Sequence, residues 1–150
     1  MKQTLGQIAS VTMGQSPSSN FYNNEQLGLP FLQGCTTFGR LYPTYDTWTT
    51  FYNKEALPGD VLFTVRAPVG DVNLCRDHIA IGRGLASIRA TTVLPRYLFY
   101  ILEANKSKFQ SASSGTIYQS INRDKLANME LDVHSPSEQQ HIVGTTSSLP

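Results

Sequence analysis

The feature that most constrains the fold is a series of short apolar runs separated by turn residues. Four runs follow one another closely: Val61–Val65, Val72–Cys75, Ile79–Ile81 and Leu85–Arg89. Glycines lie between them, at Gly70, Gly82 and Gly84. Runs of this length, interrupted at this spacing, are typical of strands joined by tight turns. The sequence therefore predicts a small, mostly antiparallel β unit in the centre of the chain.

Further strands are expected towards both ends. The β-branched run Val11–Met13 follows a short turn over Leu5–Ile8 that Thr4 can cap. Pro30–Gly34 is a brief apolar run, and Met129–Val133 has the composition of a strand.

The pattern becomes helical at Pro95, a residue that suits the first turn of a helix. Apolar side chains then recur at near-helical spacing, at Leu98, Ile101, Leu102 and Phe109. We expect one helix from about Pro95 to Gln110, packed on the sheet through these residues. A polar loop should follow it over residues 111–115.

Two capping signals mark the remaining helical turns. Asn122 can cap a short turn that ends near Leu126. Ser135, Pro136 and Glu138 form a capping box with proline at the first helical position. With 150 residues, 40% of them hydrophobic, the chain fits one globular domain. The expected fold class is α+β: a β-rich curved sheet or partial barrel with one packed helix and short flanking helical turns.

Composition argues against several classes of protein. No stretch approaches the roughly 18 apolar residues that a membrane helix needs, and no signal-peptide pattern is visible, so we expect a cytoplasmic protein without membrane contact. Cys35 and Cys75 lie far apart without a CxxC pair, which favours free thiols over zinc ligands.

Catalytic motifs are also missing. We find no serine nucleophile elbow, phosphate-binding loop, HExxH motif or suitably flanked Cys–His pair. Asp60, Asp71 and Asp77 lie in turn-like contexts, which favours turn carboxylates over a metal site. We expect no catalytic residue, no metal and no cofactor.

The charge is small overall but unevenly distributed. The formal net charge is +1. Five arginines accompany two aspartates between residues 61 and 96, and four cations accompany one aspartate between residues 105 and 125, whereas residues 126–150 hold three acids and no Lys or Arg. Scattered solvated charge explains this as readily as a basic face does, because neighbours in sequence need not share a surface.

The segment from Phe38 to Tyr52 is rich in aromatic residues and threonines. Such side chains can contact base edges and thymine methyl groups in a DNA groove. They are also ordinary strand composition, and by itself the segment fits a core or a hairpin better. Candidate DNA-contacting residues in and beside it are Thr36, Thr37, Arg40, Tyr42 and Tyr45, and of these Arg40, Tyr42 and Tyr45 could reach base edges.

The polar run from Ser113 to Ser120 combines hydroxyls, an amide and accessible backbone N–H groups, which are the groups that proteins use to position a phosphate backbone. A plain solvent loop is the equally good alternative. Arg66, in a turn between strands, could grip a phosphate, pair with Asp71 or extend along the surface. The candidate phosphate-contacting residues are Arg66, Ser114, Gly115, Thr116, Tyr118, Gln119, Asn122, Arg123 and Lys125.

Together these segments resemble a target recognition domain from the specificity subunit of type I restriction-modification enzymes. The family's opening is similar to Leu5-Gly6-Gln7-Ile8 with Gly14-Gln15-Ser16-Pro17. Its internal signatures are matched in order by Pro30–Gly34, by Pro58–Phe63 with Arg66–Gly70, and by Ile81–Arg89, and its ending by Gly115-Thr116 through Gln139-Gln140. The resemblance extends along essentially the whole chain.

The resemblance implies a module that recognises double-stranded DNA and leaves adenine methylation and cleavage to methyltransferase and restriction subunits. Such subunits carry two recognition domains in tandem, separated by long helices that dock the methyltransferase. By this comparison residues 1–134 are the recognition domain, and residues 135–150 are the truncated start of a conserved spacer helix.

Two other interpretations remain open. The chain could be a recognition domain from a single-chain restriction-methylation enzyme. Alternatively, the aromatic segment could bind a partner protein, with no role in DNA binding. A heptad-patterned helix and a second Leu-Gly-x-Ile motif in the intact gene would argue against the protein-binding alternative.

Overall fold

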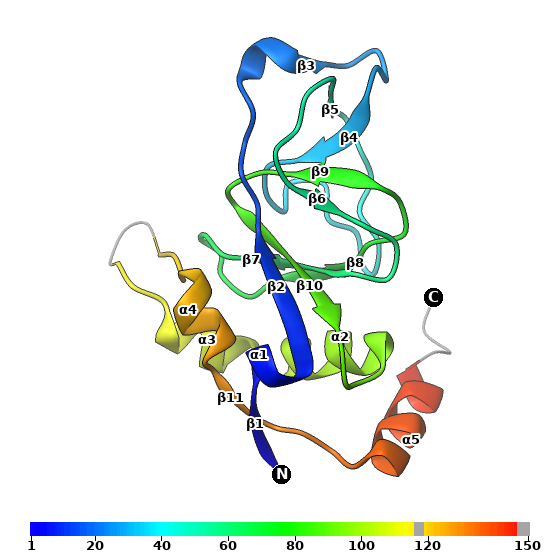
Figure 1. Cartoon of the computed structure of the whole chain (residues 1–150), viewed down its shortest axis with the longest axis vertical. Helices are drawn as coiled ribbons and strands as arrows, with labels where there is room; N and C mark the ends of the chain where they lie inside the picture. The colour runs from blue at the N-terminus through cyan, green and yellow to red at the C-terminus, as the bar shows by residue number, and fades with distance from the viewer. Residues whose placement is uncertain (116–118, 147–150) are drawn as a thin grey trace.

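A computed structural model of the chain describes residues 1–115 and 119–146, with side chains described to residue 144. The predicted central strands form a four-stranded antiparallel sheet (Figure 1). Its order is β2 (Ala9–Met13), β10 (Leu85–Ala90), β7 (Val61–Thr64) and β8 (Val72–Leu74). In the register of this sheet, Ile88 of β10 lies between Val11 of β2 and Val61 of β7. Every residue of β7 is buried, which is why its sequence is a continuous apolar run.

A second sheet of five short strands lies above the first in Figure 1. Its order is β3 (Tyr22–Asn23), β5 (Trp48–Thr49), β4 (Leu29–Leu32), β9 (Ile79–Ile81) and β6 (Glu55–Ala56). β4 and β9 run parallel, and the other neighbours run antiparallel. Leu62 and Leu85 of the first sheet pack with Ile79 and Ile81 of the second in a small hydrophobic cluster. The two sheets therefore share a core, and the predicted α+β class with curved, mostly antiparallel sheets is confirmed.

The single helix predicted from Pro95 to Gln110 is in fact two helices, α2 (Pro95–Ala104) and α3 (Lys106–Ala112). Asn105 interrupts them with φ −107° and ψ 19°, and its side-chain Nδ2 donates to the carbonyl of Ile101 at 2.7 Å. This local bond gives the backbone an alternative to continued helical geometry. The predicted packing face is confirmed, because Leu98, Ile101, Leu102 and Phe109 are all buried in the main hydrophobic core.

Several short elements complete the fold. β1 (Lys2–Thr4) pairs antiparallel with β11 (Glu130–Asp132). β11 lies within the strand that the sequence predicted at residues 129–133. The other short elements are α1 (Leu5–Ile8), the 3₁₀ turn η1 (Ser19–Phe21) and α4 (Arg123–Ala127).

Both predicted helix caps are formed. The side chain of Asn122 accepts a hydrogen bond from the backbone N–H of Lys125 at 2.8 Å and begins α4. In the capping box of α5 (Pro136–Thr146), Ser135 N–H donates to Glu138 Oε1 at 3.1 Å, and Glu138 N–H donates to Ser135 Oγ at 3.3 Å. α5 packs against α2.

Asp60 is a turn carboxylate, as the sequence predicted, and it also connects two strands. Its carboxylate accepts from the backbone N–H of Leu57 at 2.9 Å. It also accepts from Ser87 Oγ and from Arg89 Nε, both at 2.7 Å, although the residue is only 1% exposed. A buried carboxylate is costly unless hydrogen bonds compensate for its lost hydration. Here the bonds to Ser87 and Arg89 connect the start of β7 to β10.

The cysteines are free, and burial raises the pKa of the Cys75 thiol to about 12. The described residues contain no cluster of three His, Cys, Asp or Glu side chains suited to a metal ion. None of the described helices has the length and apolar character needed to cross a membrane.

Candidate nucleic-acid interface

The predicted polar loop docks on the turn between β7 and β8. Ala67 N–H donates to the carbonyl of Gln119 at 2.8 Å, and Arg66 forms an isolated β-bridge with Ser120. The loop closes on itself where Ser114 and Ser120 exchange backbone hydrogen bonds of 2.9 and 3.0 Å. In Figure 1 the β7–β8 turn and the described ends of this loop lie on the same side of the molecule, to the left of β7. Thr116 and Tyr118 lie outside the described residues.

This contact brings together predicted phosphate-contacting residues that are distant in sequence. Arg66, Gln119 and Ser120 line a hollow of about 300 Å³ with Ala67, and all four are exposed. Gly115, also exposed, has a φ of +100°, a conformation that favours glycine.

α4 adds two exposed cations next to this loop. Arg123 donates from Nε to the carbonyl of Val11 at 3.4 Å, so its guanidinium is anchored at the outer edge of β2. Lys125 is exposed, and its backbone N–H is held by the Asn122 cap. The sequence placed Asn122, Arg123 and Lys125 in the candidate site, and the structure places all three directly after the docked loop.

Arg83 belongs to the same surface, although the sequence analysis did not include it. It is exposed at the tip of the β9–β10 turn, and its backbone N–H donates to Ser16 Oγ at 3.1 Å. Val65 N–H donates to the carbonyl of Gly84 at 3.0 Å, which sets this turn beside Arg66. Arg83 and Arg66 become neighbours only through long-range hydrogen bonds, which the sequence does not reveal. The local sequence around Arg83 indicates only a Gly-Arg-Gly turn.

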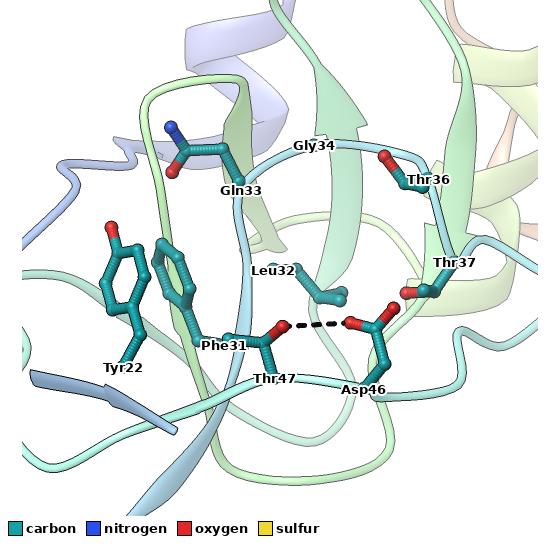
Figure 2. Close-up of a pocket in the computed structure, with 9 residues that line it drawn as sticks. All are labelled: Tyr22, Phe31, Leu32, Gln33, Gly34, Thr36, Thr37, Asp46 and Thr47. Atoms are coloured by element: carbon teal, nitrogen blue, oxygen red, sulfur yellow. Dashed lines mark hydrogen bonds between the residues drawn. The ribbon is translucent and has the colours of Figure 1, made fainter. Parts of the chain in front are cut away.

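The β9–β10 turn also supports a second loop, over residues 33–37. Gly84 N–H donates to the carbonyl of Gln33 at 3.0 Å, and Ser16 Oγ donates to Gln33 Oε1. A Cβ at residue 84 would lie 2.5 Å from the Gln33 carbonyl, so the approach requires glycine there. This loop carries Thr36 and Thr37, which line a hollow of about 320 Å³ (Figure 2).

The remaining candidates lie elsewhere. Tyr42 OH accepts from Arg96 at 3.3 Å, and its ring lies under the guanidinium of Arg76 at 4.7 Å. Tyr45 OH donates to Asp77 at 2.8 Å. Burial is the larger cause and this hydrogen bond the next in raising the pKa of Tyr45, so its hydroxyl stays protonated and remains a donor. Arg40 is exposed and borders a different hollow.

The aromatic segment as a whole is divided between core and surface. Phe38 and Tyr45 pack against the smaller hydrophobic cluster, whereas Phe51 is 50% exposed. The structure thus connects the loop of Thr36 and Thr37 to the turn that carries Arg83, whereas the hydroxyls of Tyr42 and Tyr45 bind Arg96 and Asp77.

Comparisons with known proteins identify the class of domain that carries this surface. Residues 1–149 match the sequence profile of the type I restriction modification DNA specificity domain. The chain belongs to this family, as the resemblance in its motifs predicted.

Individual relatives agree with this assignment. The MjaX specificity subunit of Methanocaldococcus jannaschii, assigned to a type I restriction enzyme, is 38% identical over 134 residues, covering 88% of this chain and 32% of the relative. The crystal structure of the HsdS subunit from Thermoanaerobacter tengcongensis superposes with a TM-score of 0.86 at 37% identity, covering 98% of this chain and 36% of that one. The type I restriction-modification S subunit from M. genitalium shares the fold alone, with a TM-score of 0.78 at 17% identity, covering 98% of this chain and 38% of that one. The chain thus spans about a third of the length of the relatives it matches.

Proposed function

We propose that this domain recognises a short sequence in double-stranded DNA and takes no part in bond making or breaking itself. The observation that carries the proposal is the surface formed by Arg66, Arg83, the described ends of the docked loop (residues 114–115 and 119–120), and Arg123 with Lys125 in α4. Exposed cations with adjacent hydroxyl, amide and backbone donors are the groups that contact phosphates. Membership of a DNA specificity domain family supports the same assignment.

We assign two tasks to neighbouring parts of this face. The Arg66–Arg83 surface, here defined as Arg66, Arg83, Gln119, Arg123 and Lys125, would position the DNA through its phosphates. The hollow beside it, lined by Thr36 and Thr37, would contact base edges. Arg40, Tyr42 and Tyr45 stay a separate prediction, because they lie outside both parts.

The wider role follows from the relatives. In a complete specificity subunit we expect this domain to direct methyltransferase and restriction subunits to one part of their DNA site, acting in the cytoplasm. Residues 1–134 would form the recognition domain. α5, which starts from a complete capping box after His134, would be the beginning of a spacer helix.

Selection from a pool of randomised duplexes tests the function directly. We expect the chain to enrich one short motif, and the Lys2→Ala variant to enrich the same motif, since Lys2 is an exposed cation in β1 outside all the candidate sites. Recovery of duplexes without any shared motif would overturn sequence-specific recognition.

A further inference from the structure

The hollow beside the Arg66–Arg83 surface combines an apolar wall with a polar rim. Tyr22 of β3 and Phe31 of β4 form the wall, with their ring centroids 4.8 Å apart. The rim carries Gln33, Thr36, Thr37, Asp46 and Thr47, on two loops that face each other (Figure 2). We name this hollow the Asp46 cleft.

Asp46 dominates the hydrogen-bonding character of the cleft. Its Oδ1 accepts from Thr47 Oγ1 at 3.0 Å. In Figure 2 the carboxylate lies between the hydroxyls of Thr37 and Thr47. An ionised carboxylate only accepts hydrogen bonds and has about four lone-pair sites, so it keeps capacity for an external donor. The residue is exposed, so such a donor can reach it.

A second polar group in the cleft has unused hydrogen-bonding capacity. Thr37 Oγ1 is buried and makes no hydrogen bond to any described residue. Buried polar atoms normally have a partner, so an unpaired one at the edge of a hollow indicates a place for an external polar group.

The charges exclude a phosphate as the occupant. Among the residues that the structure describes, no Lys, Arg or His lines the Asp46 cleft. A phosphate placed there would meet the Asp46 carboxylate without a compensating cation, and like charges at contact distance repel. A neutral group that offers N–H donors fits the cleft instead.

The cleft is continuous with the surface that we propose binds phosphates. Gln33 on its rim is bonded to Gly84, the residue after Arg83, and to Ser16, which also binds the backbone of Arg83. A duplex held by Arg83 and Arg66 would lie next to this rim, and the part of it that suits Asp46 is a base edge, because base edges offer N–H donors and a phosphodiester offers none.

We propose that Asp46 selects a base with an exocyclic amino group, cytosine or adenine, at one position of the recognised sequence. This inference rests on the proposed function and deepens it. In the major groove cytosine N4 and adenine N6 donate, whereas guanine O6 and thymine O4 accept. A carboxylate therefore binds cytosine or adenine and repels guanine or thymine. This repulsion against the wrong bases is itself a source of specificity.

The test compares the wild-type chain with Asp46→Asn in the randomised-duplex selection. Asparagine keeps the shape but can both donate and accept. We expect the wild-type motif to contain one position restricted to C or A, and the variant to lose that restriction while its other positions stay unchanged. At that position the preference of the wild type for C or A over G or T should fall by roughly 5- to 150-fold in the variant, the usual range for one discriminated base. On random duplexes its affinity should not fall, because a negative charge has been removed.

Asp132→Asn serves as the matched control, because Asp132 is an exposed carboxylate in β11 at the other end of the fold. It should leave the motif unchanged. A thermal melt of each variant shows that the fold is retained. If the wild type selects a motif and Asp46→Asn selects the same one, this inference fails while the proposed function stands. If the wild type selects no motif, both fail.

Discussion

Glu138 controls the start of α5 through hydrogen bonds that depend on its ionisation. The backbone N–H of Ser135 and then its hydroxyl hold the pKa of Glu138 below its usual value. A carboxylate whose pKa is lower in the folded state stabilises that state above its unfolded pKa, and the contribution is lost as the pH falls through the folded pKa. The cap should therefore be intact at neutral pH and weaken only below about pH 4.3, the ordinary glutamate pKa.

The signal of the Ser135 amide proton in NMR spectra measures this effect. We expect it to shift as the pH is lowered from about 6 to about 3. Glu138→Gln, whose amide oxygen can still accept from Ser135, should not show this acid transition. The same titration in both proteins would assign the change to a group other than Glu138.

Single residues also show where the sequence was an incomplete guide to the candidate site. Arg66 and Gln119 were predicted because each lies in a polar turn with suitable chemistry. Arg83 and Asp46 were missed because their significance depends on neighbours far away in sequence: Ser16 and Val65 for the Arg83 turn, and the loop at residues 33–37 for Asp46. Spacing along one segment carries no information on such contacts.

The secondary-structure elements could be predicted where their patterns were local. β7 and β10 are long enough to give clear apolar runs, and α4 and α5 begin at side-chain caps that the sequence shows directly. The two-residue strands β3, β5 and β6 are too short to have any periodicity, and long-range pairing alone creates them. The break at Asn105 was hidden because the apolar spacing continues from Ile101 to Phe109 across it.

α2 is the element whose packing most directly stabilises the sheet. Leu102 is fully buried in the main core, where α2 contacts β7, β8 and β10. Leu102→Ala should lower the free energy of unfolding by about 2–5 kcal/mol, because it removes buried methyl groups and leaves a cavity. Urea denaturation measures the change.

Glu103→Ala is the control for this element, since Glu103 is the next residue of α2 but is exposed. It should change the free energy of unfolding by no more than about 0.5 kcal/mol. Equal effects of the two substitutions would show that the packing face of α2 has been misassigned.

At the scale of the whole molecule, a single domain with this surface should bind DNA weakly and largely through phosphates. One recognition module buries roughly 600–1,000 Å² of protein surface. A second domain linked by spacer helices would add avidity that the chain alone does not have. The net charge of +1 is compatible with this binding, because the local distribution of charge and not its total determines the attraction to phosphates.

If Arg66 and Arg83 hold the phosphate backbone of bound DNA, the salt dependence of binding must show it. The measurement is the affinity for one labelled duplex at several salt concentrations, for the wild type, Arg66→Ala, Arg83→Ala and the control Lys2→Ala. Each of the first two variants should weaken binding to all duplexes alike and lower the slope of log affinity against log salt by about one unit, because one phosphate contact is lost. Lys2→Ala should keep the wild-type slope. If Arg66→Ala and Arg83→Ala keep the slope of the wild type, these two arginines do not contact phosphates.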